Sequence, residues 1–408
     1  MVLFHIVCFF KGDDILKVYI IDEGIDRMGG VERVVSVLAN EFVTHFDKVE
    51  VISEFKSSNK PFYDYNENVD FTYLISHIDK FVNKISKKSV LFYLLKLFER
   101  IIKKTILPIK IKKTIKKVNN SDVVIFARVQ VALDFLPAFQ KLNLNPKVIV
   151  RDAATLECLS KNEKYKFKKY FPKFVDKFIV SSDESMKNYR NFFKNASIDM
   201  VKIYNPLGIV PNIGYNYNSK KIISIGRLHP QKGFDSLIRS FALIADRYPD
   251  WTLEIYGSGR EEKNLKKIIS NYNLNEKVLI KKSTKNVVKL FNSSSIFVLP
   301  SRYEGYANVL VEAMSCGIPC ITYDWISGAN EIIKNGTNGI IVKLKDKNKY
   351  FSGARDLEDE KKLASAMEKL VNNPSLCEKY SLLSSNIIKT RNTSSIIENW
   401  ISIIEEYH

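Results

Sequence analysis

A chain of 408 residues is longer than one ordinary hydrophobic core requires, so its length predicts two domains. The composition is that of a globular protein, with 45% hydrophobic and 26% charged residues, and no apolar run reaches the ~18 residues of a membrane-spanning helix. The net charge of +18 comes without a sequence signature of RNA or DNA binding, so nucleic acid is not an expected partner.

The first half of the chain alternates short apolar runs with amphipathic stretches, which is the pattern of a parallel sheet covered by helices. Residues 1–16 precede the first convincing strand and are expected to be an N-terminal extension, for which one hypothesis is a translation start near Leu16. Residues 17–205 are assigned to an N-terminal domain. Its expected strands are 18–21, 49–52, 123–126, 147–150 and 177–180, and its expected helices are 31–42, 91–106 and 182–193.

The segment 80–117 holds thirteen Lys or Arg residues and a single acid, Glu99, so it carries two thirds of the net charge. Its apolar residues recur at helical spacing up to Pro108, which is expected to break the helix. A basic amphipathic helix is typical of proteins that bind anionic membrane surfaces. The candidate membrane contacts are Lys96, Arg100, Lys103 and Lys104. The alternative is a solvated face of a helix that packs on its own sheet.

Residues 206–220 are rich in Pro, Gly and Asn and are expected to form a hinge. A second series of strands and helices follows, which assigns residues 221–390 to a C-terminal domain. Its expected strands are 222–225, 252–256, 278–281, 296–299, 320–323 and 339–342. Residues 391–408 are expected to form a last helix that packs back on the first domain.

Glycines and cations follow several of these strands, where open α/β sheets bind their ligands. Gly29-Gly30 allows close backbone approach and opens a helix whose N–H groups suit an anion, although a simple turn would explain the pair equally well. Arg227 and Lys232 follow another strand. A guanidinium fork and an ammonium point charge together suit a diphosphate.

Two glutamates eight residues apart, Glu304 and Glu312, follow the strand expected at 296–299. The first lies in a loop and the second in a short helix that Gly317 and Pro319 end. Both carboxylates and the helix N-terminus would therefore face one ligand. Paired carboxylates are also the mark of glycosidases, but a glycosidase would leave Arg227 and Lys232 unexplained. The five cysteines lack the spacing of a zinc site, and no other metal site is expected.

Four segments together resemble one known family. The motifs GRLxxxKG, YGSG, SRYEGYxNxLxEAMxxGxPxI and GxxEIIxxGxNGxxV, with GGVERVVSVLAN near the start, are similar to the retaining glycosyltransferases of family 4. The resemblance covers residues 17–390 and is strongest in the second half. It implies an α/β protein of GT-B fold, in which two Rossmann-like domains enclose a cleft and a C-terminal helix crosses back.

The resemblance implies a role for each motif residue in binding a nucleotide-sugar donor. Arg227 and Lys232 would contact the diphosphate, Glu312 would accept hydrogen bonds from the ribose, and Glu304 would lie beside the donor sugar. The residues that the resemblance implies to be catalytic are Glu304, Arg227 and Lys232. The implied donor-binding residues are Gly30, Gly257, Gly305, Tyr306, Ala307, Asn308, Val309 and Glu312.

The acceptor side departs from the family pattern. Many relatives have a histidine or an aspartate after the fourth strand, where this chain has Phe126-Ala127-Arg128. The candidates for positioning the acceptor are Arg128, Arg151 and Asp152. In the retaining mechanism proposed for the family, the leaving phosphate itself takes the acceptor proton, so neither a strong base nor a metal cofactor is implied.

The expected function is therefore metal-independent, retaining transfer of a sugar, from a UDP-sugar rather than a GDP-sugar. With the basic segment, the expected acceptor is a lipid-linked or membrane-anchored glycan in bacterial polysaccharide or glycoconjugate assembly. The expected location is cytoplasmic and peripheral, on the inner face of the cell membrane. The alternatives are a sugar-nucleotide epimerase of GT-B build, which would need no acceptor, and a non-catalytic membrane-surface scaffold.

Overall fold

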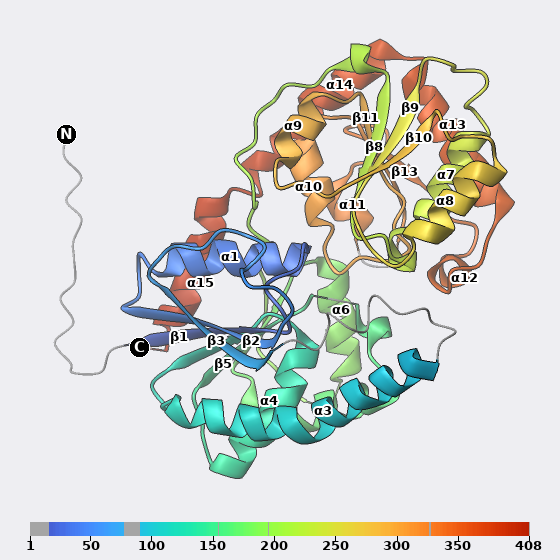
Figure 1. The fold of residues 1–408 in the computed structure, drawn as a ribbon. Helices are drawn as coiled ribbons and strands as arrows, with labels where there is room; N and C mark the ends of the chain where they lie inside the picture. The colour runs from blue at the N-terminus through green and yellow to red at the C-terminus, as the bar shows by residue number, and fades with distance from the viewer. Residues whose placement is uncertain (1–15, 77–89, 154, 195, 326–327, 408) are drawn as a thin grey trace, which may run out of the picture.

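A computed structural model describes residues 16–76, 90–153, 155–194, 196–325 and 328–407, with the backbone alone at 90–96 and 98–100. Residues 1–15 of the expected extension and 80–89 of the basic segment lie outside this part. Within it, the chain forms two parallel sheets with helices packed on them (Figure 1).

The first sheet has seven parallel strands in the order β3-β2-β1-β4-β5-β6-β7. Its strand order reverses between β1 and β4, where Val18 pairs with Val123. The strands are β1 (Lys17–Asp22), β2 (Lys48–Lys56), β3 (Val69–Ser76), β4 (Val123–Phe126), β5 (Lys147–Arg151), β6 (Lys177–Val180) and β7 (Met200–Lys202). The helices of this half are α1 (Gly30–Phe42), α3 (Val90–Thr114), α4 (Val129–Leu142), α5 (Lys161–Phe174) and α6 (Asp183–Phe192).

The second sheet has six parallel strands in the order β10-β9-β8-β11-β12-β13, and its order reverses between β8 and β11. The strands are β8 (Lys221–Ile225), β9 (Thr252–Tyr256), β10 (Val278–Lys281), β11 (Ile296–Leu299), β12 (Cys320–Tyr323) and β13 (Ile340–Val342). Its helices are α7 (Phe234–Ala242), α8 (Glu262–Asn271), α9 (Val287–Asn292), α10 (Asn308–Ser315), α11 (Ala329–Ile332), α12 (Lys347–Phe351), α13 (Leu357–Val371) and α14 (Pro374–Ser384).

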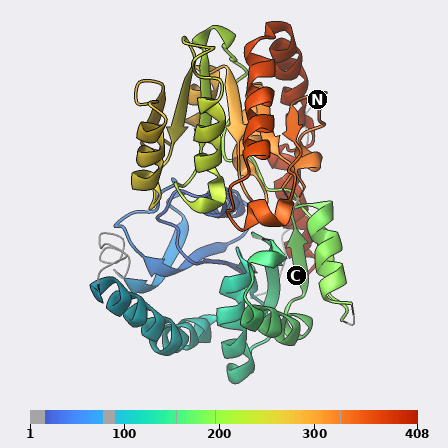
Figure 2. The same cartoon turned by 90° about the vertical axis from the view of Figure 1, so that its right-hand side faces the viewer.

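The last helix, α15 (Thr393–Glu405), leaves the second sheet and packs beside α1 of the first half (Figures 1 and 2). Trp400 and Ile404 are buried in the same core as Val18 and Phe42, and the rings of Phe42 and Trp400 lie 6.4 Å apart. The predicted fold class, two Rossmann-like sheets with a C-terminal helix that crosses back, is confirmed. The residue boundaries assigned to the domains and the hinge stay predictions.

The prediction that Pro108 breaks the basic helix is wrong, because α3 continues through it to Thr114. A proline inside a helix costs about 3 kcal/mol. Leu107, Ile111 and Ile115, spaced four residues apart from just before Pro108 to just past the end of α3, are buried in the core of the first half. Their burial outweighs that cost, since each fully buried aliphatic side chain contributes about 1.5–3 kcal/mol. In the described part of the chain, no helix combines the length and the apolar character needed to cross a bilayer.

Candidate functional site

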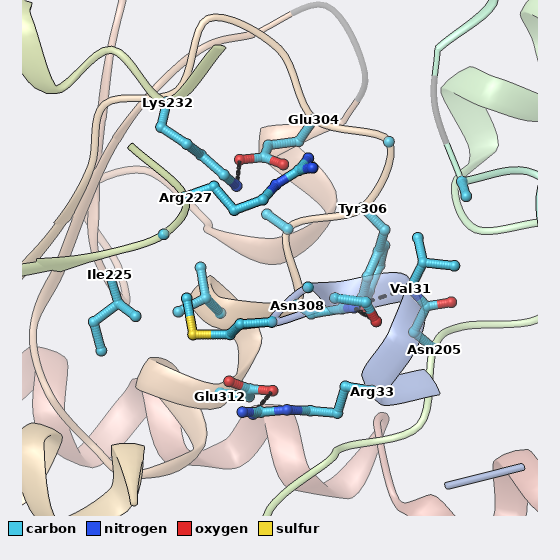
Figure 3. A pocket seen from close by; sticks show the side chains of 18 of the residues that line it. Val31, Arg33, Asn205, Ile225, Arg227, Lys232, Glu304, Tyr306, Asn308 and Glu312 are labelled. Atoms are coloured by element: carbon cyan, nitrogen blue, oxygen red, sulfur yellow. Dashed lines mark hydrogen bonds and ion pairs between the residues drawn. The ribbon is translucent and has the colours of Figure 1, made fainter. Parts of the chain in front are cut away.

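The reversal points of the two sheets face one cavity, and the chain segments after β1, β5, β8 and β11 line it (Figure 3). Ligands of open parallel sheets bind at such points. The predicted residues that line the cavity are Gly30, Arg151, Asp152, Arg227, Lys232, Glu304, Gly305, Tyr306, Ala307, Asn308, Val309 and Glu312. The structure therefore brings most of the candidate site together from segments that are far apart in the sequence.

Two predicted residues lie outside the cavity lining. A Cβ atom on Gly257 would lie 1.9 Å from the carbonyl oxygen of Gly226, so this glycine lets the turn after β9 pack under the turn after β8. Arg128 is held by two carboxylates, with Nε donating to Asp22 at 2.5 Å and Nη2 donating to Glu32 at 2.7 Å. Its charge is already neutralised within the first half of the molecule.

At one end of the cavity, Lys232 and Glu304 form an ion pair with 2.6 Å between Nζ and Oε1. The hydroxyl of Ser301 donates to the same carboxylate oxygen at 2.5 Å. Figure 3 shows the Arg227 side chain reaching toward this pair from the end of β8. Two cations and one carboxylate thus meet in a partly buried pocket, where their electrostatic interactions are stronger than in water.

Helix α10 begins at the cavity without a side-chain cap, because its N-cap residue is Ala307. Its first residue, Asn308, donates to the carbonyl oxygen of Gly30 at 3.0 Å and accepts from Asn205 at 2.8 Å. A Cβ atom on Gly30 would lie 2.8 Å from the side-chain nitrogen of Asn308, so a larger residue here would displace the Asn308 side chain. The start of α1 therefore meets the N-terminus of α10 directly, and an uncapped helix N-terminus favours an anion.

At the other end of the cavity, Glu312 pairs with Arg33, a residue that the motif analysis missed. Arg33 Nη1 lies 2.6 Å from Glu312 Oε1, and both side chains are buried (Figure 3). Burial raises the pKa of Glu312, and Arg33 opposes that shift. Tyr63, from the loop between β2 and β3, also lines the cavity and lies with its ring 5.0 Å from the Arg33 guanidinium.

Arg151 and Asp152, at the end of β5, each have one hydrogen-bonded and one unpartnered terminal atom. Arg151 Nη2 donates to Asn205 at 2.7 Å, and Asp152 Oδ1 accepts from the amide and the hydroxyl of Ser181, each at 3.0 Å. Arg151 Nη1 and Asp152 Oδ2 are buried without a hydrogen-bond partner among the described residues. Burial raises the pKa of Asp152 to about 6 and lowers that of Arg151 to about 10. A buried polar atom without a hydrogen-bond partner is energetically unfavourable. A bound ligand could supply the missing partners of these two atoms.

The residues predicted to contact a membrane lie on α3, away from this cavity. Lys103 Nζ lies 3.6 Å from a carboxylate oxygen of Glu23 and above the ring of Phe55, so its charge is partly engaged. Lys104 is exposed. The side chains of Lys96 and Arg100 lie outside the described part of the helix.

The sequence and the fold of this chain are similar to those of known glycosyltransferases. Residues 209–373 match the family model for glycosyl transferases group 1. An uncharacterized glycosyltransferase of Haemophilus influenzae is 27% identical over 382 residues, which are 93% of this chain and 97% of that protein. The N-acetylgalactosamine-N,N'-diacetylbacillosaminyl-diphospho-undecaprenol 4-alpha-N-acetylgalactosaminyltransferase of Campylobacter jejuni is 30% identical over 228 residues, 52% of this chain and 61% of that one.

Among solved structures, the pneumococcal O-GlcNAc transferase GtfA in complex with UDP and GlcNAc shares the fold. The TM-score is 0.74 at 16% sequence identity, and the match covers 96% of this chain and 99% of that one. The family match lies in the half that supplies Arg227, Lys232, Glu304 and Glu312, and the Haemophilus relative extends the similarity over nearly the whole length. Residues 209–373 therefore belong to the group 1 glycosyltransferases, and the chain as a whole has the GT-B fold of these enzymes.

Proposed function

We propose that this enzyme is a retaining, metal-independent glycosyltransferase that takes its sugar from a UDP-sugar. The observation that carries the proposal is the meeting of Arg227, Lys232 and the uncapped start of α10 in one cavity that also holds Glu312. Cations and a helix N-terminus suit the diphosphate, and a carboxylate suits the ribose hydroxyls. The reported relatives favour uridine, since UDP occupies the pneumococcal enzyme.

The proposed chemistry follows the charge that develops in the reaction. As the bond between sugar and diphosphate breaks, negative charge grows on the leaving oxygen, where Arg227, Lys232 and the N–H groups of α10 stabilise it. Positive charge grows on the sugar ring, beside the carboxylate of Glu304. The acceptor hydroxyl attacks from the face of the leaving group, and the leaving phosphate takes its proton. The unpartnered atoms of Arg151 and Asp152 then position the acceptor or the sugar by hydrogen bonds.

For the acceptor, we propose a lipid-linked or membrane-anchored glycan reached from the cytoplasmic face of the membrane. The Campylobacter relative is named for an undecaprenol-linked acceptor, which supports a lipid carrier. The surface of α3 supports it too. Leu97, Ile101, Ile106 and Ile109 are exposed there, and Ile109 is 68% exposed. Next to them, a hollow between α3, α4 and α5 is lined by Lys104, Lys112, Lys141 and Lys166. Exposed apolar side chains among lysines suit an anionic lipid surface.

Calorimetry with UDP and GDP, followed by a transfer assay, tests the proposal. The purified protein should bind UDP more tightly than GDP, and a panel of UDP-sugars should contain one that labels a lipid extract of bacterial membranes. The product should keep the anomeric configuration of the donor, and addition of EDTA should leave the rate unchanged. Failure to bind either nucleotide would refute the donor assignment. Loss of activity in EDTA, restored by a divalent cation, would refute metal independence.

A further inference from the structure

The contact between Arg33 and Glu312 is a buried ion pair that joins the two halves of the enzyme. Arg33 lies in the first turn of α1, and Glu312 lies in α10, 279 residues later. Removing one partner of such a pair leaves an uncompensated buried charge, which is strongly unfavourable. The pair lies in the same cavity as the diphosphate cations, at the end where the proposed function places the ribose (Figure 3).

The surroundings fix the Arg33 side chain in place. Its aliphatic part passes so close to Gly208 that a Cβ atom there would lie 2.0 Å from Arg33 Cδ. The ring of Tyr63 lies on the guanidinium, and Arg33 Nη1 donates a hydrogen bond to Glu312 Oε1. Glu312 Oε2 accepts no hydrogen bond from the described residues, so one oxygen of the carboxylate is held and the other is available. An ionised carboxylate is a pure acceptor, which is what two ribose hydroxyls require.

We propose that Arg33 is a positioning residue for the nucleoside of the donor: it keeps Glu312 ionised and oriented as the acceptor for the ribose hydroxyls, from across the cleft. This inference rests on the proposed function and deepens it. Because the cation belongs to the first half and the carboxylate to the second, the ribose site is complete only while the two halves touch. Nucleotide binding and contact between the domains are therefore coupled through this one pair.

The charge state of Glu312 gives the proposal a measurable signature. The titratable and charged groups that face Glu312 are Arg33 from α1, Tyr63 from the loop after β2, and Cys316 from the end of α10. Arg33 is the one among them that favours the ionised carboxylate, against the effect of burial on its pKa. Without Arg33, the buried carboxyl group takes up a proton at a higher pH. Protonation turns one oxygen into a donor and removes its role as an acceptor.

The test is UDP binding by calorimetry between pH 5.5 and 8.5, with wild type and Arg33→Met, which keeps much of the aliphatic packing. The ratio of the two Kd values cancels any titration of UDP itself. We expect a large ratio at low pH that falls as the pH rises, by about tenfold for each pH unit below the Glu312 pKa of the variant. A ratio of one, or a ratio above one that stays constant with pH, would overturn the inference.

Two further variants separate the effect of charge from that of domain contact. Lys285→Met breaks the exposed pair with Asp64, 2.8 Å apart, which also joins the two halves but lies outside the cavity lining. Its Kd should match that of wild type at every pH, and a ratio that follows the Arg33→Met profile would overturn the inference. The double variant Arg33→Met/Glu312→Gln should show no pH dependence relative to Glu312→Gln alone. A persistent slope would assign the titration to another group. If wild type itself bound no UDP, the proposed function would fail, and this inference with it.

Discussion

The donor end of the cavity depends on three side chains that balance one another. Lys232 is paired with Glu304, and Arg227 reaches toward the same carboxylate from the end of β8 (Figure 3). Both cations are in place before a donor binds. An incoming diphosphate therefore meets them before the bond between sugar and phosphate breaks. Such preorganised charges act on the transition state without reorganisation, which is why each contributes strongly to the rate.

Lys232→Ala and Arg227→Ala should each lower kcat by about a hundredfold, the effect of losing one stabilising donor in such a site. The measurement is the initial rate of sugar transfer at saturating donor. Lys266→Ala is the matched control, because Lys266 lies in the same half and forms an exposed pair with Glu262. Its rate should equal that of wild type. Near-normal rates in both site variants would show that neither cation stabilises the leaving group.

Asp152 should make the stability of the ligand-free enzyme depend on pH. Its pKa of about 6 lies above the ordinary 3.8, so the folded state binds the proton more tightly than the unfolded state. Protonated Asp152 therefore makes its full contribution to the free energy of unfolding below about pH 4. This contribution is lost as the pH rises through about 6. Two units of pKa correspond to about 2–3 kcal/mol.

Replacing the acid with its amide tests this directly. The melting temperature of Asp152→Asn, minus that of wild type, should be larger at pH 8 than at pH 5, because only the wild type carries the buried charge at pH 8. Asp250→Asn serves as the control, since Asp250 is exposed and paired with Lys220. The same difference at both pH values would mean that Asp152 is not the titrating group.

The sequence located the cavity residues that belong to motifs and missed those that do not. Arg227, Lys232, Glu304 and Glu312 follow strands at spacings that carry a chemical meaning. Arg33 lies in the same glycine-started segment as Gly30, yet nothing in that segment says that its side chain faces Glu312. Tyr63 and Asn205 lie in segments without any pattern. Contacts across the cleft depend on how two domains meet, and local periodicity holds no information about that.

At the scale of elements, burial decided which strands and helices could be predicted. β9 to β12 coincide with the predicted strands because they are short apolar runs between turns. The sequence does not predict β3, because it is an edge strand in which only Val69 and Leu74 are buried. α5 was missed because Phe167 and Phe171 are its only fully buried side chains, among six lysines. α3 continues past Pro108 because the burial of its apolar side chains outweighs the tendency of a proline to end a helix.

The lysine-lined hollow beside α3 should govern binding to anionic membranes. Lys104, Lys112 and Lys141 replaced together by Gln should weaken pelleting with vesicles that contain anionic phospholipid, by about 1 kcal/mol per lysine. The loss should be greater at low salt, where charges are less screened. The matched control replaces Lys263, Lys266 and Lys267 on α8, in the other half. Equal pelleting of both triple variants would favour a helix whose lysines merely face solvent.

At the scale of the whole molecule, the two halves also meet at a helix end. The first backbone N–H groups of any helix have no partner within the helix. In α6, the N–H groups of Asp183 and Glu184 donate to Oε1 of Glu331, which belongs to α11 in the other half, at 2.8 and 3.3 Å. Ser182 caps the amide of Ser185 from within its own half. The protection of two amides in the first half therefore depends on a carboxylate of the second.

Hydrogen exchange at these two amides should report domain contact. If nucleotide binding draws the halves together through Glu312 and Arg33, UDP should slow exchange in a peptide that covers the start of α6, although Asp183 and Glu184 do not line the nucleotide cavity. In Glu331→Ala the amides should exchange faster, and UDP should no longer slow them. The start of α5 provides the internal control, because Ser160 and Glu163 cap each other within one half. Exchange at α6 that is unaffected by UDP in wild type would show that nucleotide binding and domain contact are independent.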